Sequence, residues 1–545
     1  MFDEPRIADA EDDSAEANFT PLTPLSFLPR AAKLFPDRVA LVHGTLWQNW
    51  RETYARCVRL ASALRSRGIC PGDIVAIIAP NIPAMYEAHF GVPMAGAILN
   101  TLNIRLKAEE IAFQLGHSGA RIVMVDREFS ETVASAIKMI KVPPLVIDIA
   151  DELYDGPSAM EGVIGYEALL AEGSPEERWL MPKDERDPIS LSYTSGTTGE
   201  PKGVLTHHRG AHLNALSQII TWTLPYNPVF LWTLPMFHCN GWCFPWAIAA
   251  QGGTNICLRK VDPPLVTDLI ATHGVSHMCG APIVYSMLIE HLDNKKRSLA
   301  KPIQGMIAGA APPKALMQGA ERVGFDLTHV YGLTEVYGPA AVCLKQPGWA
   351  DKPIEERARL NSRQGVAMIS QEAMRVLDPE TMQPVPADGE TVGEIMFRGN
   401  ATMTGYLKNP EGTAKAFAAQ WFHTGDLAVV ESDGYVRITD RSKDVIISGG
   451  ENISSLEIED VLQLHPAVLL AAVVAKTDER WGEVPCAFIE LRTDREVSSE
   501  ELEAFCRSHL AGFKVPKSIK FGVVPKTSTG KVQKTVLRKL AETDV

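Results

Sequence analysis

The sequence predicts an α/β protein of more than one domain, and three observations support this prediction. Short apolar runs, typical of buried strands, alternate along the chain with helical patterns. The length of 545 residues exceeds what a single hydrophobic core serves. Hydrophobic residues make up 46% of the chain and charged residues 22%, which disfavours a disordered, collagen-like or coiled-coil protein.

Individual elements follow from local patterns. Apolar runs predict buried strands over residues 73–80, 120–126, 190–193 and 304–308. Apolar residues at helical spacing predict helices over 50–65 and 107–115. Residues 148–187 are rich in Asp, Glu, Gly and Pro and have weak periodicity, so we expect a surface connection there.

A domain boundary is predicted near Asp440, after which the pattern becomes compact. Two capping boxes, Ser454-x-x-Glu457 and Ser498-x-x-Glu501, predict helix starts, and apolar runs predict strands over 469–475 and 486–491. We therefore expect an N-terminal domain over residues 1–440 and a small C-terminal domain over 441–545.

Charge and cysteine content narrow the class of protein. The formal net charge of −13 disfavours nucleic-acid partners, and no apolar run approaches the roughly 20 residues of a membrane-spanning helix. The acidic start of the chain does not resemble a secretory signal. Nine scattered cysteines disfavour a disulfide framework. These features predict a cytoplasmic enzyme that does not bind nucleic acid and is not an integral membrane protein.

A glycine-rich loop over residues 193–204 carries the most information. It reads Tyr193-Thr-Ser-Gly-Thr-Thr-Gly-Glu-Pro-Lys-Gly-Val204, follows a predicted strand and precedes a helix expected near His208. Glycines allow backbone N–H groups to turn inward, hydroxyls donate to phosphate oxygens, and Lys202 adds positive charge. The order of residues matches neither the Walker A pattern nor the dinucleotide pattern G-x-G-x-x-G. The loop therefore predicts an anion site of another kind.

The C-terminal stretch 511–545 is basic although the protein is acidic. It contains eight Lys or Arg residues and two Asp or Glu residues. A solvated surface explains this composition, and so does contact with a phosphate-rich ligand.

Five motifs, in order along nearly the whole chain, resemble those of the adenylate-forming superfamily. Beside the loop they are Tyr331-Gly-Leu-Thr-Glu335, Thr424-Gly-Asp426, Asp440-Arg-Ser-Lys-Asp-Val-Ile446 and Pro525-Lys-Thr-Ser-Thr-Gly-Lys531. This superfamily includes acyl-CoA synthetases, adenylation domains of peptide synthetases and beetle luciferases. The resemblance implies a large N-terminal domain of packed α/β sheets with a barrel-like subdomain, and a small mobile α+β C-terminal domain.

The resemblance also implies roles for single residues. Lys531 would bridge the substrate carboxylate and the α-phosphate, Thr334 would donate to that phosphate, and Glu335 would bind Mg²⁺. Lys443 would be the hinge of the mobile domain. The implied ATP-binding residues are Thr194, Ser195, Gly196, Thr197, Thr198, Gly199, Lys202, Gly309, Ala310, Ala311, Tyr331, Gly332, Asp426 and Arg441. Gly449 and Gly450 would let the backbone approach the pantetheine arm of CoA.

The chemistry of carboxylate activation explains why cations are needed. A carboxylate attacks the α-phosphate, and two unit charges about 4 Å apart repel by roughly 4 kcal/mol at an effective dielectric constant near 20. Each residue also has a structural alternative. Lys531 is one of many lysines in its segment, Glu335 is compatible with an exposed loop, and Asp426 with Arg441 is compatible with an ion pair at a domain edge.

The segment Pro235-Met-Phe-His-Cys-Asn-Gly-Trp242 is expected to line the acyl site. We expect His238 to gate the passage between the acyl and thiol sites and Trp242 to shape the apolar wall. A zinc site is disfavoured because a second ligand pair is missing. Amino-acid substrates are disfavoured because His238 stands where an Asp would pair with the substrate ammonium.

Together these features predict an ATP-dependent acyl-CoA synthetase with ATP, Mg²⁺ and CoA, and we also expect a homodimer. The segment 235–244 looks most like plant-type acyl-activating enzymes and bacterial short- or medium-chain and methylthiopropionate CoA ligases. Their acids are short- to medium-chain, branched, aromatic or methylthio monocarboxylates. Two alternatives stay open: an acyl-AMP ligase that loads a phosphopantetheinyl carrier protein, and a nucleotide-binding regulator without catalytic activity.

Overall fold

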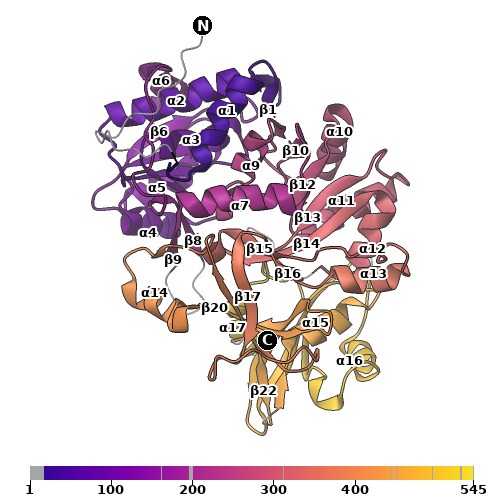
Figure 1. The fold of residues 1–545 in the computed structure, drawn as a ribbon. Coiled ribbons are helices and arrows are strands. Elements are labelled where there is room, and N and C mark those ends of the chain that lie inside the picture. Colours follow the sequence, from indigo (N-terminus) through magenta and orange to yellow (C-terminus); the bar gives the residue numbers. More distant parts are fainter. Residues whose placement is uncertain are drawn as a thin grey trace.

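The computed structural model describes most of the chain and divides it into a large N-terminal part and a small C-terminal part. The described residues are 18–160, 162–194, 201–310, 312–441, 443–449, 451–493, 495–527 and 531–543. In Figure 1 most of the N-terminal part, indigo to orange, lies in the upper and middle regions, and the C-terminal part, orange-yellow to yellow, lies at the bottom.

Two large mixed sheets form the N-terminal part. The eight-stranded sheet has the order β19-β9-β8-β4-β3-β5-β6-β7, with parallel pairing from β8 to β7. Its strands are β3 (Ile74–Ile78), β4 (Ile98–Thr101), β5 (Ile122–Asp126), β6 (Leu145–Ile149), β7 (Ile164–Gly165), β8 (Pro188–Thr194), β9 (Lys202–His207) and β19 (Gly405–Tyr406).

The nine-stranded sheet has the order β16-β15-β14-β13-β12-β10-β11-β1-β2, and its centre, from β14 to β1, is parallel. Its strands are β1 (Val39–His43), β2 (Leu46–Asn49), β10 (Val229–Leu231), β11 (Thr254–Ile256), β12 (His277–Gly280), β13 (Ile303–Ile307), β14 (Phe325–Leu333), β15 (Gly338–Val342) and β16 (Val366–Ala367).

Two smaller sheets complete the molecule. An antiparallel sheet contains β17 (Gln371–Leu377), β18 (Gly393–Gly399), β20 (Phe422–Val430) and β21 (Val436–Arg441). The C-terminal sheet contains β22 (Ile446–Ser448), β23 (Glu451–Ile453), β24 (Val468–Asp478), β25 (Gly482–Leu491) and β26 (Ser518–Phe521). The chain therefore passes from one sheet to the other between Arg441 and Ile446.

Helices cover these sheets. They are α1 (Phe27–Leu34), α2 (Trp50–Ser66), α3 (Pro83–Met94), α4 (Ala108–Ser118), α5 (Ser130–Ile137), α6 (Tyr166–Glu172), α7 (His208–Thr221), α8 (Cys239–Trp242), α9 (Phe244–Ala250), α10 (Pro263–His273), α11 (Pro282–Asn294), α12 (Lys314–Val323), α13 (Ile354–Asn361), α14 (Pro410–Ala416), α15 (Ser455–Gln463), α16 (Ser499–Arg507) and α17 (Lys534–Ala541).

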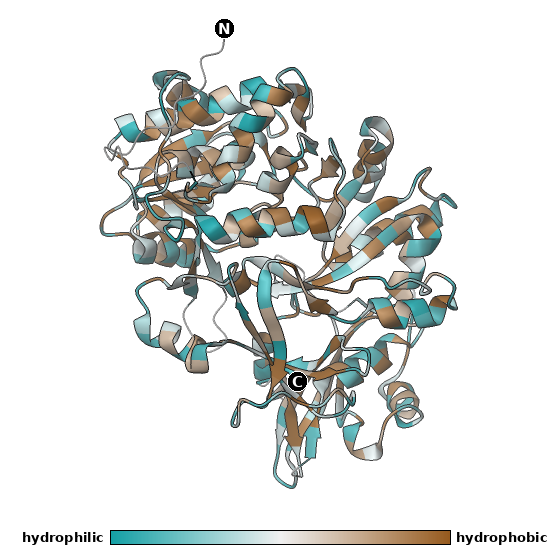
Figure 2. Cartoon of the chain, in the orientation of Figure 1, coloured by the Kyte–Doolittle hydropathy of each residue, from teal (hydrophilic) through white to brown (hydrophobic). Residues whose placement is uncertain are grey.

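The largest core joins the two large sheets. It contains apolar residues of α1, α2, α3 and α9 together with strand residues from both sheets, among them the fully buried Trp50, Trp232 and Trp246. Burying such aromatic side chains contributes roughly 2–3 kcal/mol each. Figure 2 shows the corresponding brown, hydrophobic strands inside the upper part of the molecule. A separate core holds the C-terminal part together, with Ile453, Ile458 and Leu502 fully buried.

The α/β class and its division into a large and a small domain are confirmed. The predicted strands and helices correspond to β3, β5, β8, β13, α2 and α4, and Ser454 and Ser498 accept hydrogen bonds from the N–H groups of Glu457 and Glu501. The expected surface connection over 148–187 is wrong in part. It contains β7 and α6, and α6 buries Tyr166, Leu169 and Leu170.

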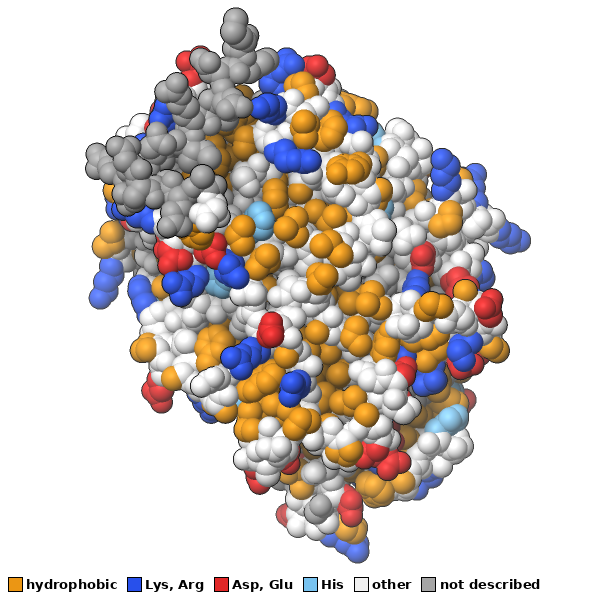
Figure 3. Space-filling view, in the orientation of Figure 1, with side chains coloured by type: hydrophobic (Ala, Val, Ile, Leu, Met, Phe, Trp, Pro, Cys, Tyr) orange, Lys and Arg blue, Asp and Glu red, His pale blue; other side chains and the backbone are white. Residues whose placement is uncertain are grey.

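The outer surface is mixed in character. Figure 3 shows hydrophobic side chains over the middle of one face, with many of the charged side chains toward its rim. Among the residues that the structure describes, no helix has the length and apolar character needed to span a bilayer.

Candidate functional site

Lys531 of the C-terminal domain reaches the N-terminal domain. Its Cε lies 3.8 Å from the position that a Cβ on Gly309 would take. Burial lowers the pKa of the Lys531 amine, Arg441 lowers it further, and Glu335 opposes this shift. The pKa of His238 is also lowered, to about 3, mainly by burial and secondly by the Lys531 charge. The ammonium group of Lys531 is thus close enough to His238 and Glu335 to shift the pKa of both.

Residues 239–243, which include the short element α8, form a left-handed turn that leads to this centre. All five residues have positive φ, from 41° at Cys239 to 65° at Cys243. Such values are costly for residues other than glycine and accumulate at functional sites. The side chain of Asn240 holds the turn, because its Oδ1 accepts a hydrogen bond of 2.7 Å from Ser190 Oγ in β8. The strained backbone is therefore fixed by a strand of the neighbouring sheet.

The turn places Cys239 in contact with two predicted site residues and Trp242 in contact with Gly338. Cys239 Sγ lies 3.4 Å from Thr334 Oγ1 and 4.0 Å from His238 Nε2. Trp242 packs on Gly338, where a Cβ would lie 3.4 Å from its Cδ1. Burial raises the pKa of the Cys239 thiol to about 11. The thiol and the imidazole therefore both stay neutral near pH 7.

A second group connects the anion loop to Glu335. Thr194 and Lys202 pair at the end of the β8–β9 ladder where the glycine-rich loop joins the two strands. Lys202 Nζ lies 4.8 Å from the centre of the Tyr406 ring, and Tyr406 Oη donates to Glu335 Oε1 at 3.1 Å. Burial raises the pKa of Glu335, while Tyr406, Lys531 and Lys202 oppose the shift. The two lysines favour the ionised carboxylate, but burial outweighs them, and the pKa of Glu335 lies above its ordinary value.

Tyr331, Asp426 and Arg441 form a third group. Asp426 and Arg441 are opposite each other in the β20–β21 ladder, and Arg441 Nε lies 3.0 Å from Asp426 Oδ1. Tyr331 Oη donates to Asp426 Oδ2 at 2.5 Å. The ring of Tyr331 stacks on Phe397 with centroids 6.2 Å apart. The resulting surface combines a flat ring with a buried acceptor, as the binding of an adenosine group requires.

Two positions near these groups favour glycine, one because a side chain would clash and the other because of its backbone conformation. A Cβ on Gly332 would lie 1.7 Å from the carbonyl oxygen of Gly338, so the β14–β15 pair requires glycine there. Gly309 follows β13 with φ of 97°. The neighbouring Ala310 is exposed.

Lys443 and Gly449 lie in the C-terminal domain and make their hydrogen bonds there. The carbonyl of Lys443 accepts from Arg538 at 3.1 Å, and Gly449 N–H donates to the Trp481 carbonyl at 2.8 Å. Gly449 has φ of 60°, and a Cβ would approach the Trp481 ring to 2.8 Å. These contacts anchor the two residues within the C-terminal domain.

Two tryptophans near the acyl segment, Trp232 and Trp246, take no part in these groups. Trp232 Nε1 donates to Asn255, and Trp246 Nε1 donates to the His89 carbonyl, so both indoles are anchored in the core. Seven predicted residues lie outside the described part of the chain: Ser195, Gly196, Thr197, Thr198, Gly199, Ala311 and Gly450.

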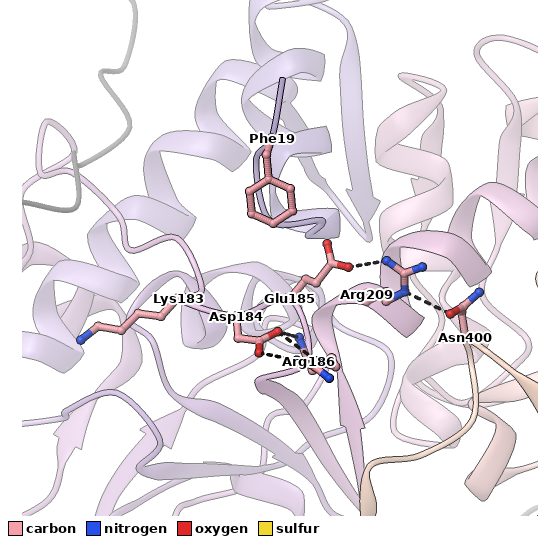
Figure 4. A pocket seen from close by; sticks show the side chains of 7 residues that line it. All are labelled: Phe19, Lys183, Asp184, Glu185, Arg186, Arg209 and Asn400. Carbon is pink, nitrogen blue, oxygen red and sulfur yellow. Dashed lines mark hydrogen bonds and ion pairs between the residues drawn. The ribbon is translucent and has the colours of Figure 1, made fainter. Parts of the chain in front are cut away.

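A cavity of about 520 Å³ lies elsewhere, between the start of the described chain and α7 (Figure 4). Arg209 pairs with Glu185 and donates to Asn400, and Arg186 pairs with Asp184. These charges compensate one another, and the described residues of the motifs do not line the cavity.

Sequence reasoning missed two residues and one strand that help to build the site. Tyr406 links Lys202 to Glu335, and Gly338 supports Trp242, but neither lies in one of the five motifs. Strand β9, which positions Lys202, was also not expected. An unexplained aromatic residue beside Gly405 was the only available signal for Tyr406.

Comparisons with known proteins identify the family. The chain matches the AMP-binding enzyme family over residues 28–407 and the C-terminal domain of AMP-binding enzymes over residues 457–531. The chain therefore belongs to the AMP-binding enzyme family, and the resemblance to adenylate-forming enzymes is confirmed.

The curated relatives are similar over almost their full length. An acetate–CoA ligase of Humulus lupulus is 51% identical over 96% of each chain. A peroxisomal acetate/butyrate–CoA ligase of Arabidopsis thaliana is 50% identical over 96% of this chain and 95% of its own. A 2-methylpropanoate–CoA ligase of Humulus lupulus is 48% identical over 96% of each. The predicted likeness to plant acyl-activating CoA ligases is thus confirmed.

Solved structures support the same fold. An anthranilate CoA ligase in complex with anthranoyl-AMP has a TM-score of 0.85 at 24% identity, covering 96% of this chain and 98% of its own. ATP-bound MatB from Rhodopseudomonas palustris has a TM-score of 0.81 at 25% identity, with 95% and 98% covered.

The expected cytoplasmic location is corrected by these comparisons. Several relatives carry the word peroxisomal in their names, among them the acetate/butyrate–CoA ligase and the butyrate–CoA ligase of Arabidopsis thaliana. The prediction was wrong because cysteine usage reports redox conditions and does not distinguish one reducing compartment from another.

Proposed function

We propose that this protein is an AMP-forming acyl-CoA synthetase for short straight or branched monocarboxylates. It would convert the acid and ATP to an acyl-adenylate and pyrophosphate, and then transfer the acyl group to CoA with release of AMP. The observation that carries the proposal is the position of Lys531, which comes from the C-terminal domain and lies with Gly309, His238 and Glu335 in the N-terminal domain.

The first half-reaction would use the cations around this centre. The attack of a carboxylate on the α-phosphate joins two anions, and Lys531 would compensate their charge. Thr334 would donate its hydroxyl to the α-phosphate. Tyr331 would lie against the adenine, and Asp426 and Arg441 would bind the ribose hydroxyls. The loop between Thr194 and Lys202 would hold the β- and γ-phosphates.

Glu335 fits the requirement for a Mg²⁺ ligand. Mg²⁺ in nucleotide sites takes one or two protein carboxylates and fills its remaining positions with phosphate oxygens and water. Glu335 offers one carboxylate, and Tyr406 donates to one of its two oxygens, Oε1, at 3.1 Å. Bound there, Mg²⁺ would screen the phosphate charges.

The acid is inferred from the wall of the site and from the relatives. Trp242 is buried against Gly338, and the neutral His238 and Cys239 offer no charge to pair with a substrate ammonium. The relatives are named for acetate, butyrate and 2-methylpropanoate. These features support a short, uncharged acyl group rather than an amino acid.

The second half-reaction would require the C-terminal domain to turn. We infer that residues 441–545 form a mobile lid with its hinge at Lys443. The turn would withdraw Lys531 and bring Gly449 and Gly450 to the pantetheine arm. A homodimer also stays a prediction, and size-exclusion chromatography with light scattering measures it.

AMP formation with a panel of acids tests the proposal. Acetate, butyrate, 2-methylpropanoate, 3-methylthiopropanoate, benzoate and octanoate are each supplied with ATP, Mg²⁺ and CoA. We expect the short acids to give AMP and the acyl-CoA in equal amounts. Formation of acyl-AMP that transfers only to a phosphopantetheinyl carrier protein would favour the acyl-AMP ligase, and absence of pyrophosphate release with every acid would favour a regulator.

A further inference from the structure

The boundary between the two domains contains a buried carboxylate, Asp440, which begins the motif 440–446 but has no role among those assigned to the site residues. Asp440 lies near the end of β21 and is 2% exposed. Its Oδ2 accepts from Ser455 N–H at 2.6 Å, and its Oδ1 accepts from Ser455 Oγ at 3.1 Å. Ser455 is the first residue of α15 in the C-terminal domain. The carboxylate therefore binds the N-terminus of a helix across the domain boundary, where a negative charge is favourable.

A second contact strengthens this connection. Ser454, the N-cap of α15, donates its hydroxyl to the Thr439 carbonyl at 2.6 Å. Residues 439 and 440 of the antiparallel sheet are thus joined directly to residues 454 and 455 of the C-terminal domain. The segment with the inferred hinge at Lys443 lies between them in sequence.

The connection continues to the segment that carries Lys531. Lys534 Nζ donates to Ser455 Oγ at 2.6 Å and pairs with Glu459 at 2.8 Å. The Ser455 hydroxyl therefore accepts from Lys534 and donates to Asp440. Lys534 is the first residue of α17, three positions after Lys531. We call the Asp440, Ser455 and Lys534 contacts the hinge latch.

Burial makes this arrangement sensitive to each partner. Burial raises the pKa of Asp440, and Lys534 opposes that shift. Burial likewise raises the pKa of Glu459, with Lys534 again opposing it. Two buried carboxylates share one ammonium group. Removal of Asp440 takes the acceptor away from the N–H and hydroxyl of Ser455, whereas removal of Lys534 takes the cation away from both carboxylates.

We propose that Asp440 is a positioning residue for the adenylation half-reaction, because the hinge latch holds the C-terminal domain in the orientation that inserts Lys531. The inference rests on the proposed function. Rotation about a hinge at Lys443 would separate Asp440 from Ser455, since they lie on opposite sides of it. The latch would thus favour the adenylation orientation and contribute nothing to the orientation that forms the thioester.

The test measures the two half-reactions separately in the full-length protein. Adenylation is followed as pyrophosphate release from ATP and butyrate, and thioester formation as butyryl-CoA from chemically prepared butyryl-adenylate and CoA. We expect Asp440→Ala to slow adenylation at least tenfold and to leave thioester formation within twofold of the unmodified protein. Asp440→Asn, which keeps an acceptor oxygen, should recover part of the loss, and Ser455→Ala should change the ratio of the two rates in the same direction.

Controls separate positioning from folding and from the function itself. Ser498→Ala removes the corresponding N-cap of α16 within the C-terminal domain and should leave the ratio of the two rates unchanged. If Asp440→Ala slows both half-reactions equally, or neither, the latch has no positioning role and the proposal is overturned. If the unmodified protein performs neither half-reaction, the proposed function fails instead. Should Asp440→Ala not fold, the ratio in Ser455→Ala decides by the same criterion.

Discussion

Replacing Lys531 with Met should separate the two half-reactions. Met has a similar length and no charge, so the substitution removes the cation and little volume. An ammonium about 4 Å from the reacting anions contributes roughly 4 kcal/mol at an effective dielectric constant near 20. Since 1.36 kcal/mol corresponds to a tenfold change in rate, adenylation should fall by about 10³. Thioester formation from prepared butyryl-adenylate should change less than threefold.

The assay compares pyrophosphate release with butyryl-CoA formation at saturating ATP and acid. Lys526→Met is the matched control, because Lys526 belongs to the same segment but pairs with Glu490 at 2.8 Å within the C-terminal domain. This control should leave both rates near those of the unmodified protein. A loss of adenylation below tenfold, or an equal loss of both rates in a folded protein, would refute the role of Lys531.

Three further predictions follow from burial and space. Trp242→Ala should enlarge the acyl site, so that the preference for octanoate over butyrate, measured as the ratio of kcat/KM values, rises at least tenfold while KM for ATP stays constant; an altered KM for ATP alone would contradict this placement. Gly332→Ala should lower the thermal midpoint strongly or prevent folding, since its Cβ would lie 1.7 Å from a carbonyl oxygen. As a control, Gly116→Ala in helix α4 adds a Cβ with nothing within 4 Å and should leave the midpoint unchanged or raise it. Burial lowers the pKa of His238 and His208 to about 3, below the ordinary value of 6.5. The unfolded chain therefore binds more protons than the folded protein below pH 6.5, and the free energy of unfolding should fall by about 1–2 kcal/mol per histidine between pH 6.5 and 5. A thermal midpoint that is constant over this range would contradict the neutral state of these histidines.

The elements that sequence predicted well are those with a local cause. The apolar runs of β3 and β5 and the capping serines of α15 and α16 depend on residues within a few positions of one another. Helix α6 was missed because the acidic, glycine-rich residues around it conceal a short apolar stripe. Strand β9 was missed because residues of the anion loop and of the strand follow one another without a break in composition.

The chemistry of the site was predictable only as a set of residue types. Motif order predicted Lys531, Glu335 and Asp426, but not the contacts that determine their charge. Tyr406 reaches Glu335 from β19, far along the chain, and no spacing rule links the two. The left-handed turn over 239–243 is equally hard to predict, because only Asn240 and Gly241 among its residues adopt positive φ readily.

The boundary near Asp440 shows how these two kinds of information combine. In sequence, Asp440 was the last residue before a compact pattern, and Ser454 was a helix cap. In the fold, the end of β21 lies against the start of α15, so residues 439 and 440 form hydrogen bonds with Ser454 and Ser455. The residues that mark the boundary in sequence therefore also connect the two domains. If the proposed hinge at Lys443 operates, the hydrogen-bonded Asp440 carboxylate would favour one orientation of the C-terminal domain, the one in which Lys531 lies against Gly309 of the N-terminal domain. Motion of the C-terminal domain should therefore begin with loss of the Asp440–Ser455 contact, and the cost of that loss should depend on Asp440 more than on the hinge residue itself.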